Sequence, residues 1–307
     1  MEDRPEAISG VDKRLVRQAF ERAAPDYEAH AVLQREIADR MISRLDYIRH
    51  QPKILLDAGA GTGFGTRGLR SHYPEAAIVA LDLAAAMLKR ANPPQTLWQK
   101  MRRASKVYSV CGDIDALPLQ TSSVDMVWSS LALQWCNDLN VSFAELYRVL
   151  APGGLLMFAT FGPDTLNQLR SAFATVDDYT HVNRFVDMHD IGDVLVSAGF
   201  NAPVMDMEYI TLTYVDLKTM LRELKAIGAH NVTAGRNPGL TGRKRWRELE
   251  AAFEQFRTNG RLPATYEVIY GHAWVDQKLP RAVRNAEGYQ VVQMHLSAKP
   301  PASDRSR

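Results

Sequence analysis

The chain is poor in cysteine and has no long apolar run. Its 307 residues include only Cys111 and Cys136, too few and too far apart for a disulfide framework or a thiolate metal site. A reducing, cytoplasmic location is therefore expected. No apolar stretch approaches the roughly 20 residues that a membrane helix needs, and the polar, acidic residues 1–6 are unlike a secretory signal. We expect no membrane partner.

Several catalytic and metal-binding motifs are also missing. The eight histidines never fall into the H-E-x-x-H spacing, and no serine stands in G-x-S-x-G, the turn that carries a hydrolase nucleophile. The formal net charge is +2, so the overall charge does not call for a nucleic-acid partner. The sequence thus predicts neither a bound metal nor nucleic-acid binding.

A glycine-rich stretch at residues 54–65 is the most informative feature present. An apolar run ends at Asp57, and alternate positions of the next segment are Gly59, Gly61, Gly63 and Gly65. The dinucleotide pattern G-x-G-x-x-G fails on this spacing, and no lysine follows as a phosphate-binding P-loop requires. The pattern fits the D-x-G-x-G-x-G loop of class I methyltransferases, which hold S-adenosylmethionine; an ordinary strand-to-helix turn is the alternative interpretation.

The chain beyond residue 50 alternates apolar strand candidates with helical segments. The predicted strands are 53–57, 77–82, 107–111, 124–129, 154–160, 204–213 and 265–275. Strands that alternate with helices are typical of parallel sheets with right-handed crossovers. We therefore predict an α/β fold of the class I methyltransferase type, a doubly wound and mostly parallel seven-stranded sheet.

Two helical regions lie outside this alternation. Residues 11–48 predict two helices separated at Pro25, and a helical pair is predicted before the last strand. Within the core, Ser142 and Glu145 predict a capping box, and Asp164 predicts another helix cap. The expected organisation is a helical lid at 1–50, a core at 51–213, a helical insertion at 214–262, the last core strand at 263–276 and a tail at 277–307.

Acids end three successive predicted strands. In open α/β sheets the ligand lies beyond the carboxyl ends of the strands, so these acids are candidates for cofactor binding. Asp82 could accept both ribose hydroxyls of an adenosyl group, and Asp113 could accept the adenine amino group. Leu83 and Ile114 could sandwich the adenine ring. The expected cofactor-binding residues are Asp57, Gly59, Gly61, Gly63, Asp82, Leu83, Asp113, Ile114 and Leu131.

Residues for the methyl acceptor are expected after the fourth strand and in loops. Gln134 and Trp135 follow that strand and either face the acceptor or pack in the core. Arg184 lies in a connection and either clamps a carboxylate or is a solvated surface residue. Tyr27 lies in the break of the N-terminal helical region. A basic group, either a solvated face or a docking patch for an acidic partner, comprises Arg243, Lys244, Arg245 and Arg247.

Several segments together resemble one family. They are 20–27 (FERAAPDY), 57–65 (DAGAGTGFG), 112–119 (GDIDALPL), 130–136 (SLALQWC), 183–185 (NRF), 224–229 (LKAIGA) and 263–266 (PATY). The chain resembles the malonyl-acyl-carrier-protein O-methyltransferases of biotin synthesis over about residues 12–275. The resemblance implies methyl transfer from S-adenosylmethionine to the free malonyl carboxylate. The two products would be S-adenosylhomocysteine and the malonyl methyl ester, which primes pimeloyl formation.

The resemblance also implies roles for particular residues. Tyr27 belongs to a lid over the methyl group, Arg184 holds the malonyl carboxylate, and the inserted helices meet the acidic carrier protein. The stretch 92–106 and the tail beyond about 276 depart from the family pattern. Two alternatives stay open: another class I methyltransferase acting on a quinone or a small acid, and a protein like the complex I assembly factors, with a hydroxylase or binding role.

Overall fold

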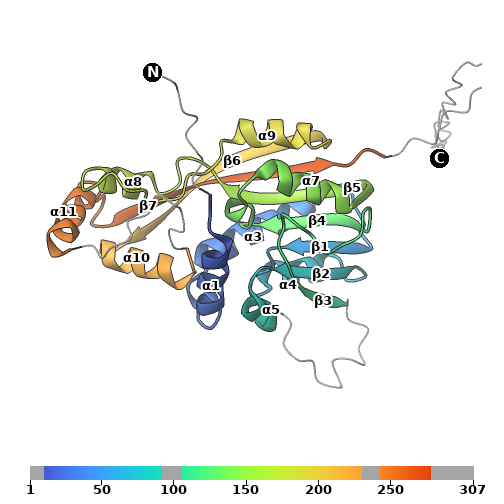
Figure 1. Ribbon diagram of the computed structural model, residues 1–307, viewed down its shortest axis with the longest axis horizontal. Helices are drawn as coiled ribbons and strands as arrows, with labels where there is room; N and C mark the ends of the chain where they lie inside the picture. The colour runs from blue at the N-terminus through green and yellow to red at the C-terminus, as the bar shows by residue number, and fades with distance from the viewer. Residues whose placement is uncertain (1–9, 92–105, 230–241, 278–307) are drawn as a thin grey trace, which may run out of the picture. The chain divides into compact units, whose positions relative to one another are not determined.

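The computed structural model describes residues 10–91, 106–229 and 242–277, which contain a seven-stranded sheet (Figure 1). Its strands are β1 (Ile54–Ala58), β2 (Ala77–Asp82), β3 (Val107–Cys111), β4 (Val124–Ser130), β5 (Leu150–Phe161), β6 (Asn201–Tyr214) and β7 (Leu262–Trp274). The strand order is β3-β2-β1-β4-β5-β7-β6, and only β7 runs antiparallel to its neighbours. The predicted doubly wound, mostly parallel sheet is confirmed.

Helices connect the strands and precede them. They are α1 (Lys13–Ala23), α2 (Tyr27–His30), α3 (Val32–Leu45), α4 (Phe64–His72), α5 (Ala85–Ala91), the 3₁₀ turn η1 (Leu133–Trp135), α7 (Leu139–Val149), α8 (Asn167–Ala174), α9 (Met188–Ser197), α10 (Leu217–Ala226) and α11 (Arg243–Glu254). Within the described residues, no helix has the length and apolar character needed to cross a membrane.

Alternating strand residues build a hydrophobic core on each face of the sheet. On one face Leu55 packs in a cluster with Ile37 and Met41 of α3. On the other face Leu56 packs in a cluster with residues of α7 and α9. The alternation follows from the two-residue period of a strand, and it places Asp57 on the same face as Leu55.

Helices α8, α10 and α11 gather around the ends of β6 and β7 (Figure 1). Helix α8 contacts β7 and α11, while α10 contacts β6. In sequence, α10 and α11 lie between β6 and β7, where the helical pair was predicted. The wider division into lid, core, insertion and tail stays a prediction, and the segments 92–105 and 278–307 lie outside the described residues.

Three local expectations were wrong. The N-terminal region forms three helices rather than two, because α2 makes a separate short turn after Pro25. Helix α7 is capped by Asp138, whose carboxylate accepts the Asn140 N–H, so Ser142 lies inside the helix. The Asp164 carboxylate accepts the Tyr209 hydroxyl at 2.9 Å, and α8 begins after Leu166 instead.

The strand order reverses between β1 and β4. From β1 the chain continues through β2 and β3 on one side, whereas β4 and β5 lie on the other. The loops that leave the carboxyl ends of β1 and β4 therefore diverge, and such a reversal point is where open α/β sheets bind their ligands. The glycine loop after β1 and the segment after β4 both lie there.

Candidate active site

The glycine loop between β1 and α4 leaves one position open. Gly59, Gly61 and Gly63 all have positive φ values, of 88°, 53° and 83°. A Cβ atom at Gly59 would lie 2.2 Å from the Ala132 Cβ, and one at Gly63 would lie 2.7 Å from the Ala91 Cα. At Gly61 a Cβ atom would meet nothing within 4 Å. Gly59 and Gly63 thus permit close packing of the protein itself, while Gly61 borders open space.

A cavity of about 100 Å³ lies beside Gly61; we call it the Asp82 cavity. The Asp82 carboxylate accepts the N–H groups of Gly61 and Ala84, each at 2.8 Å. Burial raises the pKa of Asp82 to about 6, and the two backbone hydrogen bonds oppose the rise. Each carboxylate oxygen has two lone pairs, so Asp82 can accept further hydroxyl donors.

Most of the expected cofactor-binding residues gather in this cavity. The predicted residues among its lining are Gly59, Gly61, Asp82, Leu83, Asp113, Ile114 and Leu131. The Asp113 carboxylate also forms an ion pair with the Lys13 ammonium of α1. Leu131 has a φ of 53°, an unusual backbone conformation for a leucine, and such conformations cluster at functional sites.

A second, smaller cavity of about 60 Å³ adjoins the first at Gly59 and Gly61; we call it the Asp57 cavity. Asp57 is only 2% exposed, and it accepts the Thr66 hydroxyl at 2.6 Å. Burial raises the pKa of Asp57 to about 7, the Thr66 hydrogen bond opposes the rise, and the nearby Asp82 charge adds to it. A positive charge bound beside Asp57 would therefore stabilise its ionised form.

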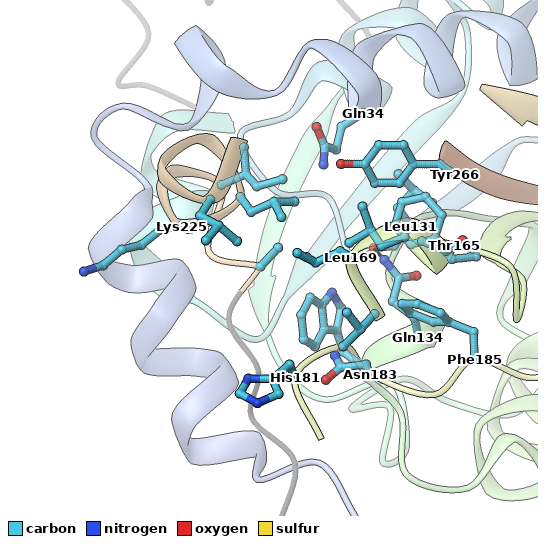
Figure 2. A pocket seen from close by; sticks show the side chains of 18 of the residues that line it. Gln34, Leu131, Gln134, Thr165, Leu169, His181, Asn183, Phe185, Lys225 and Tyr266 are labelled. Carbon is cyan, nitrogen blue, oxygen red and sulfur yellow. Dashed lines mark hydrogen bonds between the residues drawn. The ribbon is translucent and has the colours of Figure 1, made fainter. Parts of the chain in front are cut away.

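The largest of these cavities, about 310 Å³, is mainly apolar, and we call it the apolar cavity (Figure 2). Its walls come from α8, α10, the 181–185 connection and the segment after β4. The predicted residues that line it are Tyr27, Leu131, Gln134 and Trp135. In Figure 2 the Lys225 ammonium points away from the other labelled side chains. Phe20, Tyr27, Leu131 and Trp135 also line the Asp82 cavity, so the two cavities meet there.

Tyr27 lines all three cavities. Burial, together with the charge of Asp82, raises the pKa of the Tyr27 phenol above its usual range. Tyr27 is therefore a neutral phenol at physiological pH and a poor general base. The lid role expected for Tyr27 stays a prediction. Its aromatic neighbour Phe20 lies 6.5 Å away between ring centroids.

Gln134 and Trp135 lie on the turn η1 after β4. The Gln134 amide donates to the Leu131 carbonyl at 2.8 Å, which closes the turn. Trp135 packs edge-on against Phe20, with 5.4 Å between the ring centroids. Both residues border the apolar cavity and also support its wall, and a role toward the acceptor stays a prediction.

Arg184 lies apart from these residues. It is exposed and lines a neighbouring cavity of about 250 Å³, together with Arg170 and Asp177. That cavity shares Phe173, His181 and Val182 with the apolar cavity. The structure thus brings Tyr27, Gln134 and Trp135 together, with Arg184 in the adjoining cavity.

Three polar residues that sequence reasoning missed face these cavities. Gln34 Oε1, Trp128 Nε1 and Asn183 Oδ1 are buried and have no hydrogen-bond partner within residues 10–91, 106–229 and 242–277. Gln34 lines both the apolar and the Asp57 cavity, Trp128 lines the Asp57 cavity and Asn183 lines the apolar cavity. Of the three, only Asn183 had a signal in the sequence that could have identified it, namely its position next to the candidate residue Arg184.

The predicted basic group lies on the first turns of α11. Arg243, Lys244, Arg245 and Arg247 are all exposed. Arg245 approaches Asp177 to 3.8 Å, and Lys244 approaches Glu248 to 3.8 Å. Both ion pairs are loose and solvent-exposed on the basic side, so this surface keeps an excess of positive charge.

Comparison with known proteins identifies a methyltransferase domain and close relatives. Residues 56–158 match the family profile described as "Methyltransferase domain". A malonyl-acyl-carrier protein O-methyltransferase of Gallionella capsiferriformans is 54% identical over 289 residues, covering 94% of this chain and 98% of the relative. Proteins of the same name from Nitrosospira multiformis and Laribacter hongkongensis are 56% and 55% identical, covering 86% and 94% of this chain and 89% and 97% of the relatives.

Solved structures show the same fold at low sequence identity. The YcgJ protein of Bacillus subtilis matches with a TM-score of 0.55 and 14% identity, covering 79% of this chain and 99% of that chain. A protein of Bacillus halodurans matches with a TM-score of 0.54 and 18% identity, covering 77% of this chain and 99% of that chain.

Proposed function

This chain belongs to the malonyl-acyl-carrier protein O-methyltransferase family, and we propose that it transfers a methyl group from S-adenosylmethionine to the free carboxylate of malonyl-acyl-carrier protein. The product is the malonyl methyl ester that primes pimeloyl formation in biotin synthesis. One observation carries the proposal beyond the relatives' names. The apolar cavity opens onto the Asp82 cavity at Tyr27 and Leu131, so an acceptor and an adenosyl donor can meet there.

The residues around the Asp82 cavity suit an adenosyl donor. Asp82 can accept ribose hydroxyls, and open space beside Gly61 admits the ligand close to the backbone. Asp113, Leu83 and Ile114 line the same cavity, so Asp113 can accept the adenine amino group while the two apolar side chains enclose the ring. When bound, S-adenosylmethionine supplies a methyl group on a positively charged sulfur. Asp57, in the adjoining cavity, suits the positively charged part of its amino-acid end.

The chemistry requires no general base. A free carboxyl group has a pKa near ~4, so the malonyl oxygen is already ionised at neutral pH. The raised pKa of Tyr27 keeps its phenol protonated, so it shapes the junction of the two cavities without taking a proton. Alignment of the two reactants and exclusion of water are then the main contributions, and alignment alone can supply roughly 7–11 kcal/mol.

A carboxylate that leaves water needs a polar partner. We keep Arg184 as the proposed partner, because its cavity meets the apolar cavity at His181 and Val182. Asn183 is a second group of this kind, since its amide lies in the wall of the apolar cavity. The contact with the acceptor must not be too tight, because ground-state stabilisation slows the transfer.

Substitution separates these two partners. Arg184→Ala is expected to lose most turnover on malonyl-carrier protein while S-adenosylhomocysteine affinity stays near normal in calorimetry. Asn183→Ala is the comparison variant, because it removes the amide that already lines the apolar cavity. Unchanged turnover in the Arg184 variant, beside a loss in the Asn183 variant, would transfer the clamp role to Asn183.

Methyl transfer itself is tested with labelled S-adenosylmethionine and malonyl-carrier protein. A carboxyl methyl ester releases labelled methanol in mild alkali, whereas a methylated phenol or quinol does not. Label that stays off the carrier protein and appears on an aromatic hydroxyl would point to another class I methyltransferase. Hydroxylation of an arginine without methyl transfer would point to the assembly-factor alternative.

We further propose that the basic start of α11 docks the acidic carrier protein. Arg243, Lys244 and Arg247 are exposed on that surface, and complementary charge speeds and orients association. Reversing all three to Glu is expected to raise the KM for malonyl-carrier protein and to spare small malonyl thioesters. Lys53→Glu is the control, because Lys53 is exposed and directly precedes the amino end of β1, at the edge of the sheet opposite to the cavities. Equal effects on both substrates would discard the docking surface.

A further inference from the structure

The connection between α8 and α9 supplies side chains to two cavities. Residues 177–187 form neither a helix nor a strand. Asn183 and Phe185 nevertheless line the apolar cavity, and Arg184 lines its neighbour of about 250 Å³, which we call the Arg184 cavity. Such a connection lacks the repeating backbone hydrogen bonds of a helix or strand, so other contacts must fix its course.

Asp177 makes several of these contacts at the start of the connection. Its carboxylate accepts the His181 Nε2–H at 2.7 Å and the Tyr179 N–H at 3.1 Å. The side chains of Asp177 and His181 are only 10% and 14% exposed, so water screens the pair little. Burial by itself would raise the pKa of Asp177, but the hydrogen bonds from His181 and Tyr179 outweigh it and leave the pKa below its usual value. Asp177 is therefore an ionised acceptor inside the connection.

His181 forms part of the wall between the two cavities. Phe173, His181 and Val182 are the residues that line both the apolar cavity and the Arg184 cavity. The His181 imidazole stacks on the Phe173 ring of α8, with 3.7 Å between centroids and an interplanar angle of 6°. Figure 2 shows His181 beside Asn183 among the side chains of the apolar cavity. The stacking fixes the plane of the imidazole, and the hydrogen bond to Asp177 fixes its rotation within that plane.

Asp177 also faces the basic group on α11, but less closely. The Arg245 guanidinium approaches Oδ2 of Asp177 to 3.8 Å, whereas His181 bonds Oδ1 at 2.7 Å. The Arg245 side chain is 47% exposed, so this contact is screened and contributes little. The hydrogen bond to His181 is therefore the contact of Asp177 that shapes the cavity wall.

We propose that Asp177 and His181 are positioning residues for the methyl acceptor. Their hydrogen bond holds the cavity wall in place, so the backbone that follows His181 presents Asn183 and Arg184 to the acceptor. Neither residue of the pair exchanges a proton during the transfer, since the malonyl carboxylate is already ionised. The assignment rests on the acceptor proposed above, and it involves neither the methyl donor nor the docking of the carrier protein.

Steady-state kinetics and calorimetry test the pair with two variants. Asp177→Ala removes the acceptor, and His181→Phe removes the donor while keeping a ring that stacks on Phe173. Each should raise the KM for malonyl-carrier protein and for a small malonyl thioester alike, by roughly tenfold, because the lost hydrogen bond has a charged acceptor. The affinity and stoichiometry of S-adenosylhomocysteine binding should stay unchanged. His181→Phe carries the test if Asp177→Ala does not fold.

Two further variants separate positioning from other roles. The double variant Asp177→Ala/His181→Phe should raise KM no further than Asp177→Ala, because both changes remove the same contact. Asp177→Asn keeps an acceptor oxygen and should raise KM less. A lower KM in Asp177→Ala beside a higher KM in His181→Phe would show that the charge of Asp177 governs acceptor binding, and would overturn the positioning role. A fall in kcat with KM unchanged would overturn it too, because a smaller folded fraction has that effect.

A second aspartate–histidine pair provides the matched control. Asp187 contacts the His189 Nδ1 at 2.9 Å and accepts the His189 backbone N–H, which caps α9. Neither residue lines the apolar cavity or the Arg184 cavity. His189→Phe should leave KM unchanged, and Asp187→Ala should lose stability with the cap but keep the same KM. A higher KM in Asp187→Ala would show that lost stability alone raises KM, and would overturn the positioning role.

Amide hydrogen exchange reads the position of the connection without turnover. The amides of residues 178–185 should exchange faster in Asp177→Ala and His181→Phe than in the wild type, and at the wild-type rate in His189→Phe. Unchanged exchange in the first two variants would overturn the positioning role while leaving the proposed acceptor in place. A wild-type protein that methylates neither malonyl substrate would instead overturn the proposed acceptor, and the role of the pair with it.

Discussion

Lys13, at the start of α1, forms an ion pair with Asp113 beside the Asp82 cavity. The same ammonium contacts Asp115. Burial by itself lowers the pKa of Lys13, but the hydrogen bonds to the two carboxylates outweigh it and leave the pKa above its usual value. An acid expected to recognise adenine is therefore also an anchor for the N-terminal helix that lines the cavity.

Further polar contacts hold the N-terminal segment in place. The backbone N–H and carbonyl of Val11 both bond the Asn137 side chain. At the other end of α1, the Glu21 carboxylate accepts the N–H groups of Ala85 and Ala86 at the start of α5. A ligand enclosed in the Asp82 cavity thus lies behind a helix secured at both ends.

Lys13→Met is expected to lower cofactor affinity by loosening this anchor. A partly exposed ion pair contributes up to about 1 kcal/mol, which corresponds to a roughly fivefold rise in the Kd for S-adenosylhomocysteine. Arg14→Met is the control, because Arg14 is 91% exposed in its side chain and pairs only loosely with Asp12 at 3.7 Å. Calorimetry should show a change for Lys13 alone. Identical Kd values for the two variants would mean that the anchor does not affect binding.

Gly61→Ala separates backbone strain from ligand clash. The positive φ of Gly61 makes any L residue costly by roughly 1–2 kcal/mol. Gly260 has a φ of 74°, and a Cβ there would also meet nothing within 4 Å. Gly260→Ala should therefore cause a similar backbone strain at a position away from the cavities. Both variants should lose similar stability in urea unfolding, and only Gly61→Ala should lose S-adenosylhomocysteine binding. Retained binding in Gly61→Ala would place the ligand elsewhere.

Periodicity and spacing predicted the sheet because strand residues alternate locally. The strands 77–82 and 107–111 have the predicted bounds. Asp57 and Asp82 lie at the carboxyl ends of β1 and β2, as predicted. The capping box at Ser142 failed because the choice of cap depends on where the chain enters the helix. Asp138 takes that role, while the Ser142 hydroxyl donates to Asp115, 27 positions away.

The candidate site was predictable in outline only. The sequence marked Gly59, Gly61 and Gly63 alike, and only the packing of Ala132 against Gly59 and of Ala91 against Gly63 distinguishes Gly61. Likewise, the unsatisfied state of Trp128 and Gln34 depends on β4, α3 and α4 meeting at one cavity. Such properties arise from contacts distant in sequence, which no local pattern encodes.

Asp57 makes the stability of the ligand-free protein depend on pH. Its carboxyl ionises near 3.8 when unfolded and near 7 in the fold, so the folded state holds a proton that the unfolded state releases between these values. Rising pH through that window therefore lowers the free energy of unfolding. Asp57→Asn should remove this loss, on the order of a few kcal/mol, at pH 8.

Urea unfolding from pH 5 to pH 8 measures the effect. The stability advantage of Asp57→Asn should grow with pH across this range. Asp82 faces the same region with a pKa of about 6 and adds a slope of the same sign, but it is present in both proteins and largely cancels in the comparison. An advantage that does not vary with pH would show that the buried carboxyl is not the cause.

Glu267 of β7 holds the turn that leads into α8. The carboxylate is 5% exposed, and it accepts the Asp164 N–H at 2.7 Å. The turn places Thr165 and Leu166 in the wall of the apolar cavity. Glu267→Leu leaves that N–H without its acceptor and should cost about 1–3 kcal/mol of stability, whereas Glu267→Gln keeps an acceptor oxygen and should cost less.

The position of this turn makes the kinetic effect selective. Because Thr165 and Leu166 line the apolar cavity and not the Asp82 cavity, Glu267→Leu should raise the KM for malonyl-carrier protein and leave S-adenosylhomocysteine affinity unchanged. Steady-state kinetics and calorimetry on the same preparations provide both numbers. A parallel fall in S-adenosylhomocysteine affinity would indicate that the turn supports the whole sheet edge. Equal KM values for the Glu267→Leu and Glu267→Gln variants would show that the lost hydrogen bond does not cause the change in KM.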